Sequence, residues 1–433
     1  MEISQLEKWQ KSLKKREIEK EVLAYLFKPF IVVILGSRQV GKTSLLRRLM
    51  ADLVFEKKIT PSQILYFDFE IIADLSAFSS VTPESIKRVV SAYGANPQKQ
   101  TFLFIDEIQY HPNPSNLLKV IFDHLPTIKL AVSGSSTLKI RTKFKDSLAG
   151  RHKTFVLPGL TFEEFLNFKN LDLLKRNLDK EELPLGVKDN LKSLFEEYVV
   201  FGSYPKVAMS ETNEEKVSVL ESIFTSYVRR DIKDLAIIEE TEKFNRLVSL
   251  LAFQIGSLVN LSELSSASGL NRKTLEKYLF LLENTFIICL LKPFFTNKRK
   301  ELVKSQKVYF QDTGLRNYVT NNFSPLEKRP DGGSLFENAV FNLLSKNQKG
   351  TDRLRFWRTI LKNEVDFIRL GEDSLPFPYE CKLSVLGKPK IPGGLLSFVR
   401  SYHPKEAWVI NLDRFAKIIF NKTKIYFLPG WRI

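Results

Sequence analysis

Two glycines, a lysine and a threonine at fixed spacing form the first candidate site in the sequence. They fit the pattern G-x-x-x-x-G-K-T. In such a loop, backbone N–H groups turn inward around a phosphate, Lys42 reaches the β and γ oxygens, and Thr43 offers its hydroxyl to Mg²⁺. We therefore expect ATP and Mg²⁺ to bind here, with Lys42 also taking part in catalysis. The expected cofactor-binding residues are Gly36, Ser37, Arg38, Gln39, Val40, Gly41, Lys42, Thr43 and Ser44.

A second apolar run, residues 102–105, ends in two carboxylates that suit the same chemistry. Asp106 is expected to hold Mg²⁺, commonly through water, and Glu107 to orient or deprotonate the water that attacks the γ-phosphate. The plainer interpretation is a strand that ends in a solvated acidic pair. A third apolar run ends in Ser133, Ser135 and Ser136. Of these three, Ser135 is the candidate sensor of the γ-phosphate, and ordinary turn formation is the alternative.

Phosphoryl transfer commonly uses an arginine that stabilises the developing negative charge. Arg151 is the candidate for this catalytic role, and Arg229 and Arg230 are further candidates; a surface salt bridge is the alternative for each. An arginine supplied to a neighbouring copy would require assembly. No coiled-coil heptads are visible, so the oligomeric state stays open.

A parallel sheet must position these residues. From Phe30 to about Leu157, apolar runs alternate with longer helical segments, which is typical of an α/β fold with helices on both faces of the sheet. Residues 2–28 are predicted to form one amphipathic helix. The predicted domains are an N-terminal helix (1–29), a P-loop core (30–160), a helical lid (161–240), a winged helix-turn-helix (241–323) and a C-terminal α/β domain (324–433).

Composition restricts the class of protein and its partners. The 433 residues include 66 Lys and Arg against 49 Asp and Glu, and the resulting charge of +17 favours partners that carry phosphate. Cys289 and Cys381 are too sparse for a disulfide framework or a thiolate zinc site, so we expect a reducing cytoplasm. The N-terminus lacks the apolar run of a secretory signal, and no stretch is apolar enough to span a membrane.

Several motifs in order resemble a family of prokaryotic AAA-type ATPases. They are LGSRQVGKTSLL, FLFIDEIQ, VSGSS, SLAGR with PGLTFEEFL, FGSYPKV and YVRRDI, and together they extend over most of the chain. The resemblance implies an AAA-like core, a winged helix and a C-terminal domain that resembles restriction endonucleases.

The third implied domain brings a second candidate site. Glu337 lies on a predicted helix, Asp366 on one predicted strand, and Glu380 and Lys382 on the next, which looks like the PD-(D/E)xK nuclease arrangement. There, Glu337, Asp366 and Glu380 would bind Mg²⁺, and Asp366, Glu380 and Lys382 would be catalytic. The period of two puts Glu380 and Lys382 on one strand face. Val365 replaces the proline of the stricter pattern, and the fold also persists without catalysis.

DNA is the predicted macromolecular partner of the winged helix. Arg272, Lys273 and Lys277 lie near the start of the helix that would enter the major groove, and residues 292–307 hold six basic residues against Glu301. Such a stripe would make mainly salt-sensitive phosphate contacts. A winged helix that serves only as a spacer between domains is the alternative.

These sites predict an ATP-hydrolysing switch whose nucleotide state controls DNA binding, and DNA cleavage if the second site is active. The alternative is a regulatory ATPase that acts on a protein partner through a non-catalytic C-terminal module. A kinase acting on a small substrate is disfavoured because nothing suggests an acceptor pocket.

Overall fold

The computed structural model describes residues 2–134, 148–180, 182–226, 240–294, 305–348, 352–371, 375–383 and 389–433. The chain forms two units. The first comprises residues 1–158 with 226–235, and the second comprises residues 159–225 with 236–433. Four candidate residues of the nucleotide site lie outside the described ranges, namely Ser135, Ser136, Arg229 and Arg230, as does most of the basic stripe within residues 292–307, namely Lys298, Arg299, Lys300 and Lys304, with Glu301.

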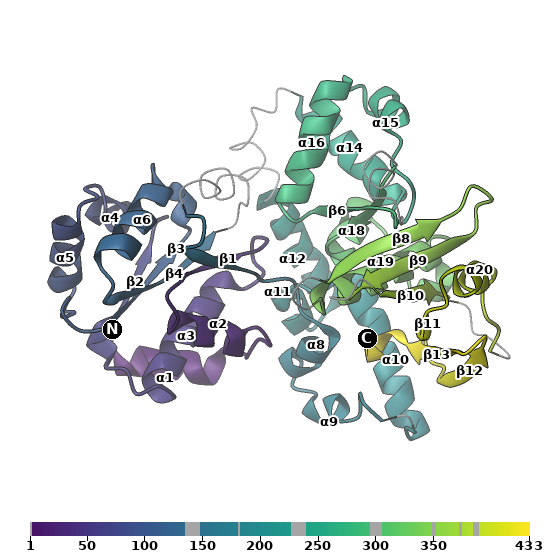
Figure 1. Cartoon of the computed structure of the whole chain (residues 1–433), viewed down its shortest axis with the longest axis horizontal. Coiled ribbons are helices and arrows are strands. Elements are labelled where there is room, and N and C mark those ends of the chain that lie inside the picture. The colour runs from purple at the N-terminus through teal and green to yellow at the C-terminus, as the bar shows by residue number, and fades with distance from the viewer. Residues whose placement is uncertain are drawn as a thin grey trace. The chain divides into compact units, whose positions relative to one another are not determined.

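Five apolar runs of the first unit form a parallel sheet (Figure 1), as the alternating pattern predicted. The strands are β1 (Ile31–Leu35), β2 (Ile64–Asp68), β3 (Thr101–Asp106), β4 (Ile128–Gly134) and β5 (His152–Val156). Their order is β2-β3-β4-β1-β5, so β1 lies inside the sheet. All five residues of β1 are buried, as expected for a strand covered on both faces.

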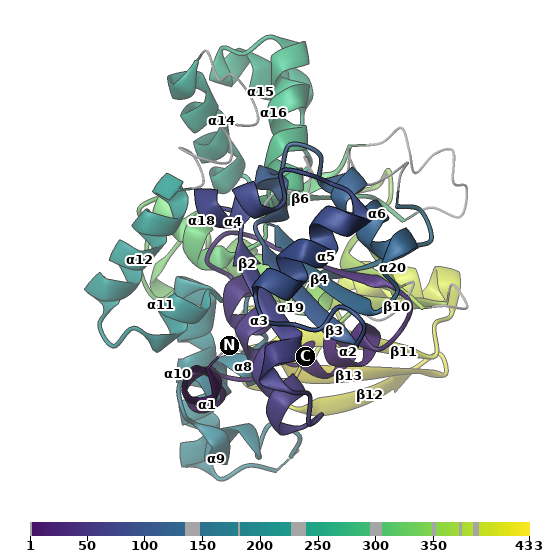
Figure 2. The same cartoon turned by 90° about the vertical axis from the view of Figure 1, so that its left-hand side faces the viewer.

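Helices cover both faces of this sheet (Figures 1 and 2). On one face, Val32 and Ile34 pack in a core with residues of α1 (Ile3–Ser12), α2 (Glu19–Leu26) and α3 (Lys42–Phe55). The opposite face receives the alternate strand residues. The helices there are α4 (Ile72–Ala77), α5 (Pro83–Ala92) and α6 (Pro114–His124).

The N-terminal segment forms two helices, and the prediction of one helix over residues 2–28 is wrong. The break lies at residues 13–18. Its cause is Arg16, whose guanidinium donates to the carbonyl oxygens of Val40 (3.1 Å) and Pro158 (2.8 Å). The Glu19 carboxylate also accepts a hydrogen bond from the backbone N–H of Arg16, at 3.4 Å. These contacts replace the hydrogen bonds of a continuous helix.

The second unit begins with helices and ends in a second sheet. Its first helices are α8 (Phe162–Phe168), α9 (Asp172–Lys175), α10 (Leu185–Phe201), α11 (Pro205–Met209) and α12 (Asn213–Ser226). Next come α14 (Thr241–Phe253), α15 (Leu261–Ser268) and α16 (Arg272–Asn284), then the antiparallel pair β6 (Ile288–Leu291) and β7 (Lys307–Phe310). The identification of this segment as a winged helix stays a prediction.

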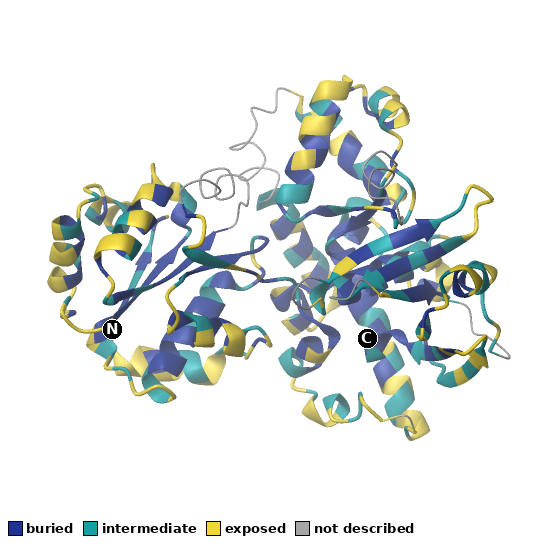
Figure 3. Cartoon of the chain, in the orientation of Figure 1, coloured by how far each residue is buried: buried dark blue, intermediate teal, exposed yellow. Residues whose placement is uncertain are grey.

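The C-terminal sheet has the order β12-β13-β11-β10-β9-β8. Strands β10, β11 and β13 run parallel and the other pairs are antiparallel. The strands are β8 (Arg353–Arg358), β9 (Glu364–Leu370), β10 (Pro376–Cys381), β11 (Glu406–Asn411), β12 (Ala416–Phe420) and β13 (Thr423–Pro429), with helices α18 (Thr313–Val319), α19 (Gly332–Lys346) and α20 (Gly393–Tyr402). Figure 3 shows the buried residues concentrated in the sheets and on the inner faces of the helices.

A buried polar network joins the first helices of the second unit to α18 and α19. Ser203 donates to Asp312 from its backbone N–H (2.7 Å) and its hydroxyl (2.9 Å). The Lys346 ammonium donates to the Ser203 hydroxyl and to the carbonyl of Leu160, both at 2.9 Å. Gly202 has φ +84°, and a Cβ there would lie 2.2 Å from a carboxylate oxygen of Asp312. The network therefore explains the FGSYP motif structurally.

Among the described residues, no helix is long and apolar enough to cross a membrane.

Candidate functional site

The phosphate-binding loop joins β1 to α3, as the sequence predicted. Gly41 precedes α3 with φ +104°, which favours glycine. A Cβ on Gly36 would lie 2.5 Å from the carbonyl oxygen of Leu157. The loop therefore passes too close to the backbone at Leu157 for any side chain at this position. The buried Lys42 ammonium donates to the carbonyls of Gly36 and Ser37, both at 3.1 Å. The loop is thus a closed turn with its cation at the centre.

Asp106 lies at the end of β3 and faces Thr43. Its carboxylate accepts hydrogen bonds from the hydroxyls of Thr43 (2.6 Å), Tyr66 (3.1 Å) and Ser133. Asp106 is almost fully buried, and these donors compensate for its burial. Thr43 and Asp106 are therefore already together, and this hydroxyl–carboxylate pair fits the predicted Mg²⁺ site.

Glu107 follows β3 in a left-handed conformation, with φ +51°. For a residue other than glycine this costs of order 1 kcal/mol or more, and such strain is common at functional sites. One carboxylate oxygen lies 4.0 Å from the Lys42 ammonium, and the other accepts from the Gln109 side chain. The backbone of Glu107 is fixed by donation to Asp106 (3.2 Å) and Ser133 (3.3 Å). The Glu107 side chain is therefore held beside the lysine of the phosphate loop.

The structure adds residues that the sequence interpretation missed. Tyr66 donates to Asp106, and Asp68 pairs in register with Asp106 on the adjacent strand β2. Burial raises the pKa of Asp68, and the charges of Asp106 and two neighbouring glutamates raise it further. On the loop itself, Arg38 forms an ion pair with Glu70 at 3.9 Å. The sequence ILYFD could have predicted the positions of Tyr66 and Asp68, because the carboxyl ends of neighbouring parallel strands meet at one edge of the sheet.

Two arginines that the sequence interpretation also missed, Arg16 and Arg48, connect the N-terminal segment to the phosphate loop and its helix. Arg16 fixes the carbonyl of Val40, which lies within the phosphate loop itself. Arg48 of α3 binds Asp52 (3.0 Å) and Glu19 (3.4 Å), and all three side chains are buried. The N-terminal segment is thereby tied to both the loop and its helix.

The structure does not bring Arg151 to the phosphate loop of its own chain. Its backbone carbonyl accepts from Ile31, at the end of β1 away from the loop. Its guanidinium binds Asp123 through two hydrogen bonds, of 2.8 and 3.2 Å. An arginine-finger role for Arg151 stays a prediction that requires a neighbouring copy, and Ser135 lies outside the described residues.

The structure gathers the second predicted set in the C-terminal sheet. The Lys382 ammonium binds Glu380 at 2.8 Å, and Asp366 accepts from the backbone N–H of Cys381 at 2.7 Å. Burial raises the pKa of Asp366 well above its ordinary value, and the nearby carboxylates of Glu337 and Glu380 add to the effect. Glu337, Asp366, Glu380 and Lys382 therefore share one electrostatic environment.

Lys307 of β7 enters the same cluster and was not predicted to do so. Its ammonium lies 3.1 Å from Glu337 and 2.5 Å from Glu364. Tyr309 donates to the same oxygen of Glu337 at 2.6 Å. Burial lowers the pKa of Lys307, but the carboxylates of Glu337, Asp366 and Glu364 outweigh it and raise the pKa above its ordinary value.

The magnesium site predicted at Glu337, Asp366 and Glu380 stays a prediction. Among the described residues, no three His, Cys, Asp or Glu side chains are arranged to hold a metal ion. Lys307 lies beside Glu337 and contributes a buried positive charge. The structure thus places a cation beside Glu337 that the magnesium prediction did not include.

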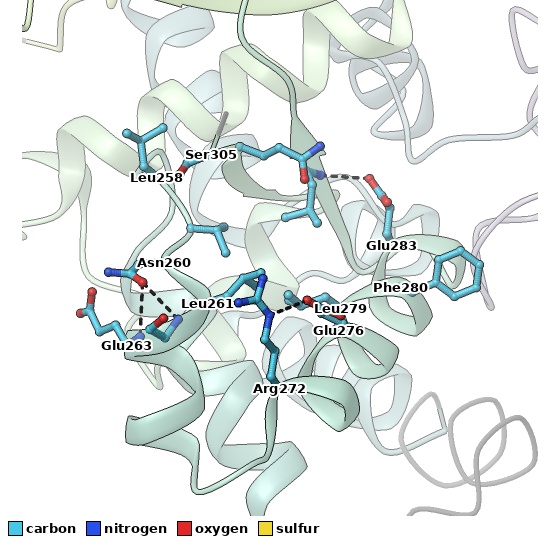
Figure 4. A pocket seen from close by; sticks show the side chains of 14 residues that line it. Leu258, Asn260, Leu261, Glu263, Arg272, Glu276, Leu279, Phe280, Glu283 and Ser305 are labelled. Atoms are coloured by element: carbon cyan, nitrogen blue, oxygen red, sulfur yellow. Dashed lines mark hydrogen bonds and ion pairs between the residues drawn. The ribbon is translucent and has the colours of Figure 1, made fainter. Parts of the chain in front are cut away.

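A groove of about 910 Å³ lies along α16 (Figure 4). Among the described residues that line it, three carry carboxylates, Glu263, Glu276 and Glu283, and one a guanidinium, Arg272. Arg272 binds Glu276 at 2.9 Å, and Glu283 accepts from the backbone of Leu290 at 3.2 Å. The described lining of the groove therefore carries a net negative charge.

The parallel sheet, the glycine loop and the Thr43–Asp106 pair define a P-loop nucleotide-binding fold. Residues 28–166 match the family model described as an AAA domain. Residues 192–326 and 332–427 match two models described as domains of unknown function, DUF8612 and DUF4143. The chain therefore carries an AAA-type P-loop ATPase domain, which confirms that part of the resemblance.

Similar full-length proteins extend across both units. An uncharacterized protein of Haemophilus influenzae is 28% identical over 359 residues, which cover 80% of this chain and 81% of that protein. An uncharacterized protein of Methanocaldococcus jannaschii is 25% identical over 368 residues, covering 83% and 76%. The solved Walker-type ATPase of Pyrococcus abyssi aligns with 14% identity and a TM-score of 0.48, covering 72% of this chain and 97% of that one.

Proposed function

We propose that this protein is an ATP-hydrolysing switch whose nucleotide state controls what its C-terminal half binds. The observation that carries the proposal is the preformed constellation of Thr43, Asp106, Lys42 and Glu107. A nucleotide site with both the magnesium-holding pair and a fixed carboxylate is equipped to hydrolyse its ligand as well as bind it.

Each residue has a separate task in this mechanism. Lys42 leaves its loop carbonyls and stabilises the negative charge of the β- and γ-phosphates. Glu107 accepts a hydrogen bond, and then a proton, from the attacking water. Thr43 and Asp106 would hold Mg²⁺, which when bound supplies positive charge against the phosphates. The hydrogen bond from the Gln109 side chain holds the Glu107 carboxylate in place.

The acidic groove favours a protein partner over DNA. Among its described lining residues, three carboxylates outnumber one guanidinium, so the groove repels phosphate and attracts a positively charged segment of another protein. The exposed apolar side chain of Phe280 at the groove adds a contact that a polypeptide can bury. We infer that this groove receives a basic segment of a protein partner, as in the regulatory interpretation of the sequence.

DNA is the second candidate partner. Lys273 and Lys277 are exposed on α16, one turn apart, and neither lines the groove. They would contribute phosphate contacts.

Paired variants on neighbouring helices separate the two partners. Glu263→Gln with Glu276→Gln should weaken binding of a fluorescent lysine-rich peptide, while Lys273→Gln with Lys277→Gln should not. The reverse pattern, with duplex DNA as the salt-sensitive ligand, would favour DNA. Glu283 is kept unchanged because it binds the β6 backbone.

The same lysine-rich peptide tests whether the bound nucleotide changes the affinity of the groove. The Glu107→Gln variant saturated with Mg²⁺-ATP and the wild type saturated with ADP should differ in peptide affinity. Equal affinities in these two states would contradict the switch while leaving ATP hydrolysis untouched.

A further inference from the structure

The carboxylate cluster of the C-terminal sheet already contains a cation. Lys307 is 2% exposed, and its ammonium contacts Glu337 on α19 and Glu364 on β9. A buried ammonium is retained only where carboxylates and hydrogen bonds replace the lost water. Its neighbours meet that requirement, since Tyr309 orients Glu337 through a further hydrogen bond to the oxygen that faces Lys307.

We propose that the Lys307 ammonium takes the place of a divalent cation at Glu337 and so excludes that ion from the cluster. The C-terminal module therefore binds its partner without cutting nucleic acid by metal chemistry. A metal ion at Glu337 would have to displace an ion pair and approach a second positive charge in a site of low polarity, where the repulsion is strong. Lys382 adds another positive charge at Glu380, at 2.8 Å.

One atom marks where the excluded ion would bind. The Oε2 atom of Glu380 is buried and has no hydrogen-bond partner among the described residues. An unsatisfied buried carboxylate oxygen is costly, and coordination to a cation would remove that cost. Removal of the Lys307 charge should therefore uncover a divalent-cation site formed by Glu337, Asp366 and Glu380.

The lysine belongs to β7, outside both the helix and the strands that carry the cluster. It ties the β6–β7 pair to α19 and β9 by ion pairs, so it also fixes this pair against the C-terminal sheet. This inference goes beyond the ATPase proposal and holds whether or not ATP is hydrolysed.

The test measures Mn²⁺ binding to the full chain without nucleotide, by electron paramagnetic resonance of the free ion. All proteins carry Asp106→Asn, which removes the predicted metal ligand of the phosphate loop. Lys307→Met, similar in length and uncharged, should add one Mn²⁺ site per chain, and adding Asp366→Asn should remove it. A Lys307→Met protein that folds but gains no site would overturn the proposal.

A second measurement decides the matter even if Lys307→Met does not fold. With Lys307 in place, Asp366→Asn should leave Mn²⁺ binding unchanged, and supercoiled plasmid should stay intact with Mg²⁺ or Mn²⁺. Mn²⁺ binding that Asp366→Asn abolishes, or nicking that both Asp366→Ala and Lys382→Ala abolish, would show that Lys307 does not exclude the ion.

Discussion

Replacement of Glu19 by glutamine should remove a pH dependence from the stability of the nucleotide-binding unit. Burial, together with the hydrogen bond that protonated Glu19 donates to Asp52 and the negative charge of Asp52, raises the pKa of Glu19 from 4.5 to about 7. The folded state therefore binds this proton more tightly than the unfolded state. The resulting stabilisation is fully present below pH 4.5 and is lost as the pH rises through about 7.

The magnitude follows from the two pKa values. The difference between 4.5 and about 7 corresponds to roughly 3 kcal/mol of unfolding free energy, lost between those pH values. Two carboxylates compete for one guanidinium here, because Arg48 binds both Glu19 and Asp52. Glutamine keeps the shape of the protonated side chain but does not titrate.

Hydrogen exchange of α3 amides reports on this unit separately from the second one. After correction for intrinsic exchange, the protection of α3 in the wild type should fall between pH 5 and pH 8 relative to the Glu19→Gln variant. Parallel pH profiles for the two proteins would refute the reasoning, because they would show that Glu19 titrates alike in the folded and unfolded states.

Two further substitutions test the supports of the fold. Arg16→Gln should weaken ATP binding by about tenfold, with little change in kcat, because the Val40 carbonyl in the loop loses a charged donor. Titration with a fluorescent nucleotide measures the affinity, and an unchanged affinity would contradict this prediction. Gly202→Ala should destabilise the second unit by more than about 2 kcal/mol in urea denaturation, because its Cβ meets Asp312. The control Gly269→Ala, at φ +71° with only the flexible Lys243 side chain nearby, should lower the unfolding free energy by about 1 kcal/mol. Equal losses of unfolding free energy in the two variants would show that the Asp312 side chain moves aside at little cost.

The features that could be predicted from sequence are those set by local order or strand periodicity. The glycine loop is contiguous, and Thr43 meets Asp106 because both follow the carboxyl ends of strands in one parallel sheet. The period of two likewise placed Glu380 and Lys382 on one face, where they now form an ion pair. Neither result needed knowledge of distant contacts.

Two of the missed residues, Arg16 and Lys307, act across long separations in sequence. Arg16 bonds to Pro158, 142 positions away, and Lys307 to Glu337, 30 positions away. Both look like ordinary surface cations in a basic chain, and only the packing of their segments buries them. The same reason explains the wrong N-terminal helix, whose break depends on contacts with the phosphate loop.

Phosphate release from Mg²⁺-ATP by the wild type, Lys42→Ala and Glu107→Gln proteins is the most direct test of the ATPase. The wild type should turn over. Lys42→Ala should lose ATP binding, and Glu107→Gln should keep ATP affinity while its turnover falls by about 10²- to 10⁴-fold. A wild type that binds Mg²⁺-ATP without releasing phosphate, or a Glu107→Gln variant as active as the wild type, would contradict the account.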